Sequence, residues 1–275
     1  MPELPEVQST LNHLHAKQLV GQVIQQLVLR ALKLRWPIDR QLCKILPGLK
    51  IQSITRRAKY LIIGTSLGNL VIHLGMSGSL QVVAKGTPAG KHDHIDLELS
   101  ETVLRFCDPR KFGAWLWVRN SELPHHKLFA QLGIEPLDDT FDADFLYKIS
   151  RAKAMPIKQF LMQAKNVVGI GNIYASESLF AAKIHPLLPA GELTIEQCQD
   201  LVAQIKAVLH AAIAAGGSSL RDFMTPDGKP GYFAGSLQVY GRAGKPCRNC
   251  QTSITKFVLA QRSTFFCASC QPPQD

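Results

Sequence analysis

The stretch KIQSITRRAKYLIIGTSLGNLVIHLGMSGSLQVV, residues 50–83, determines the expected fold of the first half of the chain. Its short runs of Val, Ile and Leu are separated by Gly and Asn, which is typical of strands joined by tight turns. The same pattern extends from Gly21 to about Val118 and includes DHIDLELS, TVLRF and GAWLWV. Several strands at this spacing predict an antiparallel sandwich or barrel.

Helical patterns lie on both sides of this strand-rich region. Apolar residues recur at helical spacing over residues 4–18, and Pro5 falls in the first turn, where its missing N–H is harmless. After Phe141 the long periodic segments are again helical, over residues 173–183, 194–215 and 218–224. These patterns predict an α+β protein of two domains, with the boundary between residues 132 and 150.

Composition limits the class of protein and its partners. The chain has 275 residues, with 31 Lys and Arg against 21 Asp and Glu, a formal charge of +10. Such a basic folded chain fits a polyanionic partner, although many basic enzymes bind no nucleic acid. The uncharged stretch 61–84 contains several polar residues and is no membrane span, and MPELPEVQS has no signal-peptide pattern. We therefore expect a cytoplasmic protein without a membrane partner.

Four cysteines near the C-terminus have the spacing of a metal site. Two pairs in the pattern C-x2-C-x16-C-x2-C can close a tetrahedral thiolate site around a hairpin, and they are Cys247, Cys250, Cys267 and Cys270. Two disulfides are the alternative, but thiols stay reduced in the cytosol, which favours zinc. Four protein ligands leave no open coordination position. We therefore expect one structural zinc ion.

The hairpin between these cysteine pairs carries a polar tip. We expect the tip to project polar groups that suit a phosphate backbone, from Gln261, Arg262, Ser263 and Thr264, flanked by Val258, Phe265 and Phe266. The remaining cysteines lie in apolar runs without partner spacing. We expect Cys43, Cys107 and Cys198 to be core residues.

The N-terminal hexapeptide MPELPE offers an unusual nucleophile. The small Pro2 permits removal of Met1, which leaves a secondary amine that can attack a carbon of aldehyde character and form an iminium. Glu3 is adjacent and can serve as a general acid or base. Taken alone, the hexapeptide is explained more simply as the Pro-Glu start of a helix.

Motifs along the whole chain resemble those of bacterial formamidopyrimidine-DNA glycosylases. They occur in the order MPELPE, RRAKY (56–60), HLGMSG (73–78), KHDH (91–94), DPRKFG (108–113), VVGIGNIYASESLF (167–180), DGKPGYF (227–233), QVYGR (238–242) and AQRSTFFC (260–267). The resemblance implies an N-terminal antiparallel β-sandwich with an N-terminal helix, then a helix-two-turns-helix domain and a zinc β-hairpin. The implied boundaries are a catalytic domain at 2–134, a linker at 135–150, a DNA-binding domain at 151–237 and a zinc hairpin at 238–272.

The resemblance also implies the chemistry. Enzymes of this family excise oxidised purines such as 8-oxoguanine from duplex DNA and then cut the abasic site by β- and δ-elimination. By similarity, Pro2 is the nucleophile at C1′ and Glu3 the acid that protonates the sugar. Lys59 is associated with β-elimination and Arg262 with δ-elimination. Alone, Lys59 would be interpreted as a solvated charge and Arg262 as a generic phosphate contact.

Further residues match the DNA-contacting positions of the family: His92, Arg110, Lys153 and Asn172. His92 could equally be a structural histidine, since KHDH contains two. A glycosylase that extrudes its target base must fill the gap in the helix, and by similarity Met76, Arg110 and Phe112 do so. In isolation, Met76 and Phe112 would more often be core residues.

The expected partner is double-stranded DNA with the damaged base preferably opposite cytosine, bound by a monomer close to the bacterial nucleoid. No redox or nucleotide cofactor is expected, because residues 169–174 lack the third glycine and the preceding strand of a dinucleotide-binding motif. Two alternatives remain. One is a non-catalytic zinc protein that binds DNA, and the other is the sister class of enzymes that excises oxidised pyrimidines.

Overall fold

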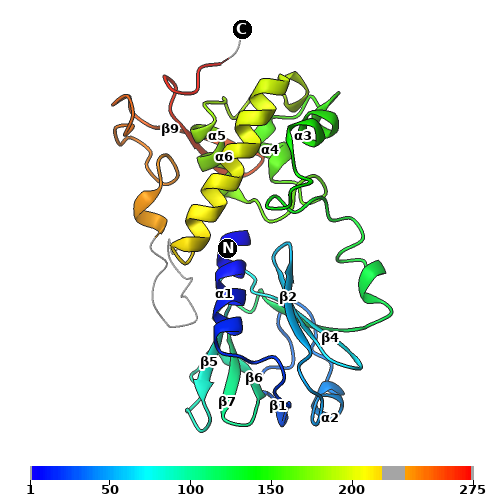
Figure 1. Cartoon of the computed structure of the whole chain (residues 1–275). Helices are drawn as coiled ribbons and strands as arrows, with labels where there is room; N and C mark the ends of the chain where they lie inside the picture. The colour runs from blue at the N-terminus through cyan, green and yellow to red at the C-terminus, as the bar shows by residue number, and fades with distance from the viewer. Residues whose placement is uncertain (1, 219–232, 274–275) are drawn as a thin grey trace. The chain divides into compact units, whose positions relative to one another are not determined.

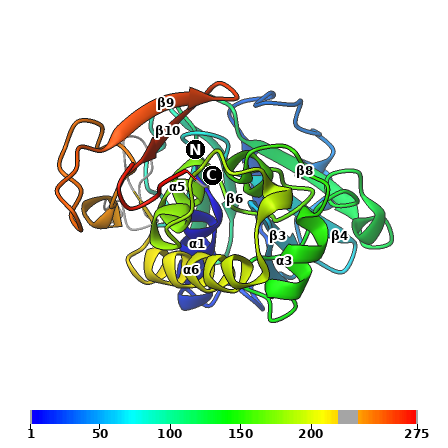
Figure 2. The ribbon, with the colours of Figure 1, turned by 90° about the horizontal axis from the view of Figure 1, so that it is seen from above.

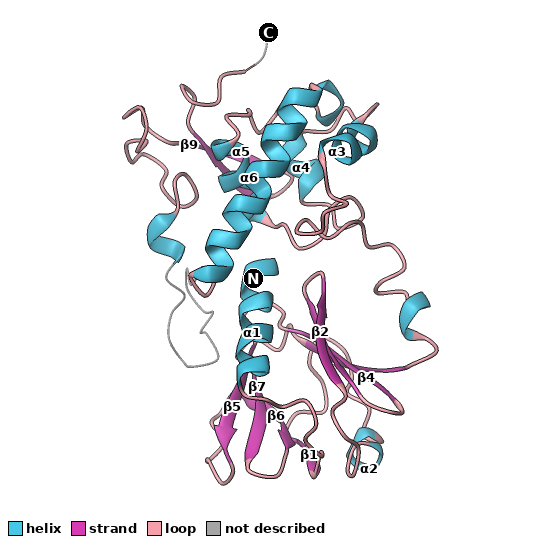
Figure 3. Cartoon of the chain, viewed as in Figure 1, coloured by secondary structure: helices cyan, strands magenta, loops and turns pink. Residues whose placement is uncertain are grey.

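The computed structural model describes residues 2–218 and 233–273. The chain divides into two compact units, one formed by Met1–Ala130 with Ile213–Tyr232 and the other by Gln131–Ala212 with Phe233–Asp275. Strands predominate in the first unit and helices in the second (Figure 3). The helix expected over 218–224 and the DGKPGYF segment fall almost entirely outside the described residues.

The first unit contains two four-stranded antiparallel sheets, which confirms the expected sandwich. One sheet has the order β1 (Gln26–Leu29), β6 (Asp93–Glu98), β7 (Thr102–Cys107) and β5 (Ser79–Ala84). The other has the order β2 (Ser53–Arg57), β3 (Tyr60–Gly64), β4 (Gly68–His73) and β8 (Ala114–Arg119). Alternate residues of both sheets join one buried cluster, for example Leu70 and Ile72 of β4 with Leu97 of β6. This alternation follows from the pleat of a strand, which points successive side chains to opposite faces of the sheet.

Helix α1 (Leu4–Ala16) packs on the sandwich within the same unit (Figure 1). Its residues Val7, Leu11 and Leu14 belong to the buried cluster of the sheets. The helix ends two residues before the expected end, because Gln18 adopts a left-handed conformation with φ of 53°. The unit also holds the short helix α2 (Leu42–Ile45) and the 3-10 turn η1 (Leu123–His125).

The second unit is built mainly from helices. They are α3 (Ala143–Ser150), α4 (Ile157–Leu161), α5 (Asn172–Ala181) and α6 (Ile195–Ala214), with the 3-10 turns η2 (Ala190–Glu192) and η3 (Phe233–Ser236). Helix α3 lies inside the interval 135–150 that was expected as a linker. Asp142 caps it by accepting a hydrogen bond from Phe145 N at 2.7 Å, and Leu146 is buried.

Two features of the division between units differ from the expected boundaries. The first stretch of the first unit ends at Ala130 instead of residue 134, and the segment 213–232, expected in the helical domain, clusters with the first unit. The contacts of Ser218 explain why the chain after α6 belongs to the first unit. Its backbone N–H and its hydroxyl both donate to Glu6 Oε1, at 2.7 and 3.1 Å.

The C-terminal hairpin consists of β9 (Thr255–Leu259) and β10 (Arg262–Phe266), which lie side by side (Figure 2). A buried cluster joins it to the helices of its unit through Phe180 and Phe265. Gln271 adds a polar link, because its side chain accepts from Cys267 N at 3.1 Å and donates to Ile184 O at 2.7 Å. Across residues 2–218 and 233–273, we find no helix of sufficient length and apolarity to span a membrane.

Candidate functional site

Pro2 and Glu3 lie buried at the start of α1. Glu3 is the N-cap of the helix in a capping box, in which the Glu3 carboxylate accepts from the backbone N–H of Glu6. In return, Glu6 Oε2 accepts from Glu3 N at 2.8 Å. The sequence therefore does form the helix start that the simple explanation predicted. The same bonds also fix the carboxyl of Glu3 next to Pro2.

Lys59 occupies the two-residue turn between β2 and β3, where Arg57 pairs with Tyr60. Ala58 in this turn has φ of 53°. Arg56 holds the turn against the N-terminal helix, because its guanidinium donates to Gln8 Oε1 and to Ala58 O, both at 2.8 Å. The turn that contains Lys59 and the helix that follows Pro2 are therefore linked within the first unit.

His73, at the end of β4, lies in a pocket of about 530 Å³ whose lining also includes Arg35, Met76, Lys111 and Phe112. Burial, together with the positive charges of Lys59 and Arg35, lowers the pKa of His73 to about 4. Its Nδ1 accepts a hydrogen bond from Gly75 N at 2.9 Å. The imidazole is therefore neutral near pH 7, with its proton on Nε2 as a donor.

The three residues expected to fill the gap left by an extruded base lie in this region of the first unit. Phe112 is 45% exposed, so it is no core residue. The guanidinium of Arg110 lies 5.0 Å from the centre of its ring. Met76 is half-buried and lines the same pocket as Phe112. An apolar surface and a cationic donor are thus presented together.

The two histidines of KHDH have different environments. His94 is buried, and its Nε2 lies 2.9 Å from the carbonyl oxygen of Asp108. His92 is half-buried and stacks edge-on against His94 at a centroid distance of 6.5 Å. The contact with Asp108 therefore gives His94 a structural role, and the DNA-contacting role of His92 stays a prediction.

In the second unit, Asn172 begins α5 and contacts the zinc hairpin. Its Nδ2 donates to Ser263 O at 2.9 Å, and its Oδ1 accepts from Lys158 Nζ at 2.6 Å. Tyr240 of the QVYGR motif lies beside it, with a hydroxyl 3.4 Å from Asn172 Nδ2. Lys153 lies exposed in the turn before α4, where its carbonyl accepts from Gly191 N at 2.9 Å.

The hairpin tip differs in part from expectation. Arg262 is exposed at the start of β10 and lines a pocket with Lys158 and Met162. Thr264, expected to project from the tip, is instead fully buried, and its Oγ1 accepts from Lys158 Nζ at 2.8 Å. The reason is packing, since strand β10 contacts α5 and the Lys158 ammonium of α4 lies against Thr264. On β9, Val258 is 69% exposed, as a flank of the tip should be.

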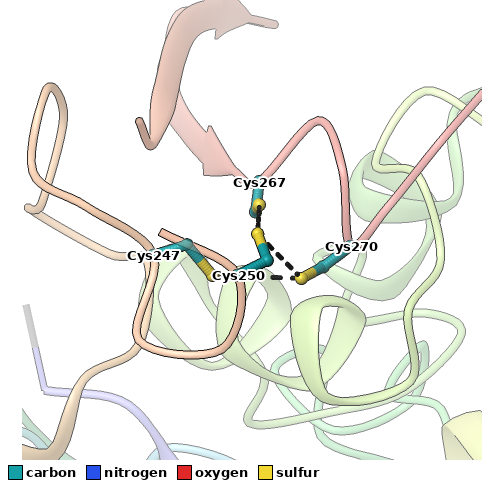
Figure 4. A group of neighbouring side chains, drawn as sticks. All are labelled: Cys247, Cys250, Cys267 and Cys270. Carbon is teal, nitrogen blue, oxygen red and sulfur yellow. Dashed lines mark hydrogen bonds between the residues drawn. The ribbon is translucent and has the colours of Figure 1, made fainter. Parts of the chain in front are cut away.

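The four predicted zinc ligands converge on one point (Figure 4). Their sulfurs all lie within 4.8 Å of one another, with separations of 3.9, 3.4 and 3.5 Å for the pairs 247–270, 250–267 and 250–270. A zinc ion with Zn–S bonds of about 2.3 Å requires tetrahedral edges of about 3.8 Å. The residues therefore fit one zinc ion with four thiolate ligands and no open position.

The other three cysteines lie outside this cluster. Cys198 is buried, as expected of a core residue, whereas Cys43 and Cys107 are only half-buried. Burial raises the pKa of Cys107 and of Cys198 to about 11. These thiols are therefore protonated and poorly nucleophilic near neutral pH.

Several residues that the sequence patterns did not single out hold the site together. Glu177 accepts hydrogen bonds from the backbone N–H groups of residues 238, 239 and 240, although burial raises its pKa. Lys158 and Arg35 line pockets, and Glu6 and Asp108 bind backbone N–H groups. For Glu6, Lys158 and Glu177 these partners are distant in sequence, so no local spacing marks them.

Comparisons with known families and proteins cover the whole chain. Residues 1–115 match the family model of the formamidopyrimidine-DNA glycosylase N-terminal domain, and residues 132–224 match the model of its H2TH domain. Residues 244–273 match a zinc finger found in FPG and IleRS. The formamidopyrimidine-DNA glycosylase of Haemophilus ducreyi is 54% identical over 276 residues, with 99% of each chain covered. That of Hydrogenovibrio crunogenus is 51% identical, with 100% of this chain and 98% of the relative covered.

Solved structures of the same family are similar to this chain over almost its whole length. A Lactococcus lactis FPG mutant in complex with DNA containing Fapy-dG has a TM-score of 0.90 and 35% identity, covering 99% of this chain and all of that one. MutM in complex with DNA containing carbocyclic 8-oxo-G has a TM-score of 0.88 and 36% identity, with the same coverage. The fold, the cysteine cluster and these similarities together show that the chain belongs to the formamidopyrimidine-DNA glycosylase family, the DNA glycosylases of base-excision repair.

Proposed function

We propose that this chain excises oxidised purines from duplex DNA and then cuts the abasic strand. The observation that carries the proposal is the placement of Pro2 and Glu3 at the buried start of α1. The turn that contains Lys59 is linked to that helix by the hydrogen bonds of Arg56. Support also comes from relatives solved with DNA that contains Fapy-dG, 8-oxo-G or an abasic site.

The first step is attack by the secondary amine of Pro2 on C1′ of the damaged nucleotide. The new N–C1′ bond replaces the glycosidic bond, whose electron pair leaves with the base and is neutralised by a proton. Glu3 protonates the ring oxygen of the sugar, so that the ring opens and an iminium forms between Pro2 and C1′. Removal of Met1 is required, because an amide nitrogen cannot supply this electron pair.

Strand cutting follows from the acidity that the iminium gives to C2′. Loss of the C2′ proton expels the 3′ phosphate by β-elimination, and loss of a C4′ proton then expels the 5′ phosphate by δ-elimination. Lys59 is the proposed phosphate partner and proton donor of the first elimination. Arg262 has that role in the second, since it is the exposed cation at the start of β10.

We assign the remaining residues to DNA binding. His92, Lys153 and Asn172 contact the backbone, and the neutral His73 adds an Nε2–H donor in the pocket. Met76, Arg110 and Phe112 fill the space left by the extruded base. Arg110 then donates to the O2 and N3 acceptors of a cytosine opposite the lesion, whereas adenine presents a donor amine there. We therefore propose a preference for lesions opposite cytosine.

The zinc ion has a structural part in this proposal. Cys247, Cys250, Cys267 and Cys270 would hold it, and when bound it keeps the hairpin of residues 238–272 folded. The hairpin in turn positions Arg262. We further propose that the protein acts as a monomer in the cytoplasm, on chromosomal DNA.

Borohydride trapping tests the proposal most directly. Chains that begin at Pro2 should form a reduced covalent adduct with a duplex that holds one 8-oxoguanine opposite cytosine. Chains that all retain Met1 are the matched control and should form none. A duplex with one oxidised pyrimidine separates this activity from that of the sister class. Full trapping by chains that begin at Met1 would refute the assignment of Pro2.

A further inference from the structure

Asp108 connects the segments that carry the proposed gap-filling residues. Its carboxylate is fully buried, and Oδ2 accepts from Gly113 N at 2.8 Å. Oδ1 accepts from Ser77 Oγ at 3.0 Å and from Arg110 N at 3.3 Å. One carboxylate therefore joins the residue that follows Met76 to both ends of the loop that carries Arg110 and Phe112.

The backbone of Asp108 makes a second set of contacts. Its N–H donates to His92 O at 2.9 Å, and its carbonyl oxygen lies 2.9 Å from His94 Nε2. The segment 91–94 is thus held by the main chain of Asp108 and the segment 74–78 by its side chain, whereas the segment 109–113 is held by both, since Lys111 N also donates to Asp108 O at 3.2 Å. This difference allows the two sets of contacts to be separated by substitution.

Two glycines show how closely the side-chain-linked segments approach each other. A Cβ on Gly75, whose φ is +69°, would lie 2.4 Å from both Phe112 C and Gly113 N. A Cβ on Gly113 would lie 2.9 Å from His73 O and 3.0 Å from Asp108 Oδ2. The two backbones are therefore in direct contact, and a movement of one displaces the other.

Two of the three gap-filling side chains lie at the surface of the first unit. Phe112 and Arg110 are exposed, and they contact each other. Their positions therefore depend on the backbone that carries them, and that backbone is fixed by Asp108. A shift of about 1 Å in a positioned group can cost about a hundredfold in rate.

We propose that Asp108 is a positioning residue that holds Met76, Arg110 and Phe112 as one unit and thereby sets the selection for the base opposite the lesion. The proposal rests on the function proposed above for these three residues. Asp108 itself contacts no DNA in this scheme. It acts through the hydrogen bonds to Ser77, Arg110 and Gly113.

Asp108→Ala and Asp108→Asn form the test pair. The Asn amide oxygen can still accept from Gly113 N, and the hydroxyl of Ser77 can rotate to accept from its NH2 group. Only the long bond from Arg110 N is lost, so Asp108→Asn should behave as the wild type. Asp108→Ala removes all three bonds and leaves buried donors unsatisfied. Asp96→Asn serves as the stability control, because Asp96 is a buried carboxylate of the same unit that accepts hydrogen bonds from Arg30 and Arg105.

The first readout is single-turnover excision of 8-oxoguanine opposite cytosine and opposite adenine. The ratio of the two rates should fall by about tenfold in Asp108→Ala and change less than about twofold in Asp108→Asn and Asp96→Asn. Cutting of a preformed abasic site should stay within about threefold in all of them, because that reaction needs no opposite-base contact. An unchanged ratio in a folded Asp108→Ala protein would overturn the proposal.

The second readout needs no activity. Amide hydrogen exchange of residues 74–78 and 109–113 should accelerate together in Asp108→Ala, while residues 91–94 stay protected through the main chain of Asp108. Acceleration confined to 109–113, or none, would overturn the coupling. A wild-type protein that excises nothing would instead refute the proposed function, and the exchange measurement would still decide whether Asp108 joins the segments.

Discussion

Lys158 Nζ lies 2.8 Å from Thr264 Oγ1, although the two residues are 106 positions apart in the chain. The lysine side chain is only 1% exposed, and the same ammonium donates to Asn172 Oδ1 at 2.6 Å. It therefore joins α4 and the start of α5 to strand β10 of the zinc hairpin. Arg262 lies two residues before Thr264 on that strand, so its position depends on this junction.

Substitution of Lys158 by Met should loosen Arg262 more than it disturbs the fold. Met fills a similar volume but donates no hydrogen bond, and bonds from a charged donor contribute about 1.5 to 3 kcal/mol each. We expect δ-elimination to slow by at least about tenfold relative to β-elimination. Denaturing gels should then show products that end in the unsaturated aldehyde instead of the 3′ phosphate. Lys165→Met, at an exposed position of the next loop, is the matched control.

Loss of the metal should separate the hairpin from the rest of the chain. Cys247→Ser, or chelation, is expected to unfold residues 238–272 and to weaken DNA binding, while the β-sandwich keeps its thermal transition. Zinc content, binding titrations at several salt concentrations and circular dichroism measure the three effects. Cys43→Ser outside the cluster should change none of them. Unaltered affinity in a metal-free protein would contradict the structural role of the zinc ion.

Glu3→Gln should divide the two activities. An amide oxygen can still accept from the N–H of Glu6, so the helix start is preserved, but the amide cannot protonate the sugar. Base excision should therefore drop by at least about a hundredfold, whereas cutting of a preformed abasic site, which already contains an aldehyde, should drop less than about tenfold. Parallel single-turnover assays with the exposed Glu101→Gln as control test this. Equal losses would indicate a defect in binding or folding.

Arg110→Ala should reduce the preference for cytosine as well as the rate. A lost bidentate contact to a base is worth about 1 to 3 kcal/mol, or about ten- to a hundredfold in rate if it is felt in the transition state. Lys111→Ala removes one positive charge from the adjacent exposed position and should weaken binding equally for both opposite bases. A cytosine-to-adenine ratio that survives Arg110→Ala would place the selection elsewhere.

His73 should make the stability of the first unit depend on pH. Its pKa is about 4 in the folded protein and about 6.5 when unfolded, so the unfolded chain binds more protons between these values. The stabilisation is complete above pH 6.5 and is lost as the pH falls towards 4, with a slope of at most about 1.4 kcal/mol per pH unit. Urea unfolding of wild type and His73→Gln at pH 4.5 and 7.5 measures the difference. Acidification from pH 7.5 to pH 4.5 should lower the free energy of unfolding more in the wild type than in His73→Gln.

Local sequence periodicity was sufficient for most of the fold. The short apolar run around Leu70 and Ile72, bounded by Gly and Asn, predicted a strand because the signal lies within a few residues. The cysteine spacing predicted the metal cluster for a similar reason. The short α4 and the N-capped α3 were not foreseen, since their helical turns are too few to show a period.

The site was less predictable where it depends on contacts between distant residues. Nothing within KHDH distinguishes His92 from His94; the distinction comes from the carbonyl of Asp108, 14 residues beyond His94. Thr264 was expected to be exposed because its neighbours are polar, yet its partner is Lys158. The roles of Pro2, Lys59 and Arg262 came from the resemblance and stay predictions until they are tested.

The bonds between Glu6 and Ser218 have a consequence for synthesis on the ribosome. Glu6 is among the first residues to emerge, and Ser218 is made 212 residues later. At about 5 to 20 residues per second, roughly 10 to 40 s separate the two. The helix that presents Pro2 therefore acquires its contact with Ser218 only after most of the helical unit has been translated. A nascent or truncated chain that ends before Ser218 can hold a formed sandwich and still lack the finished start of α1.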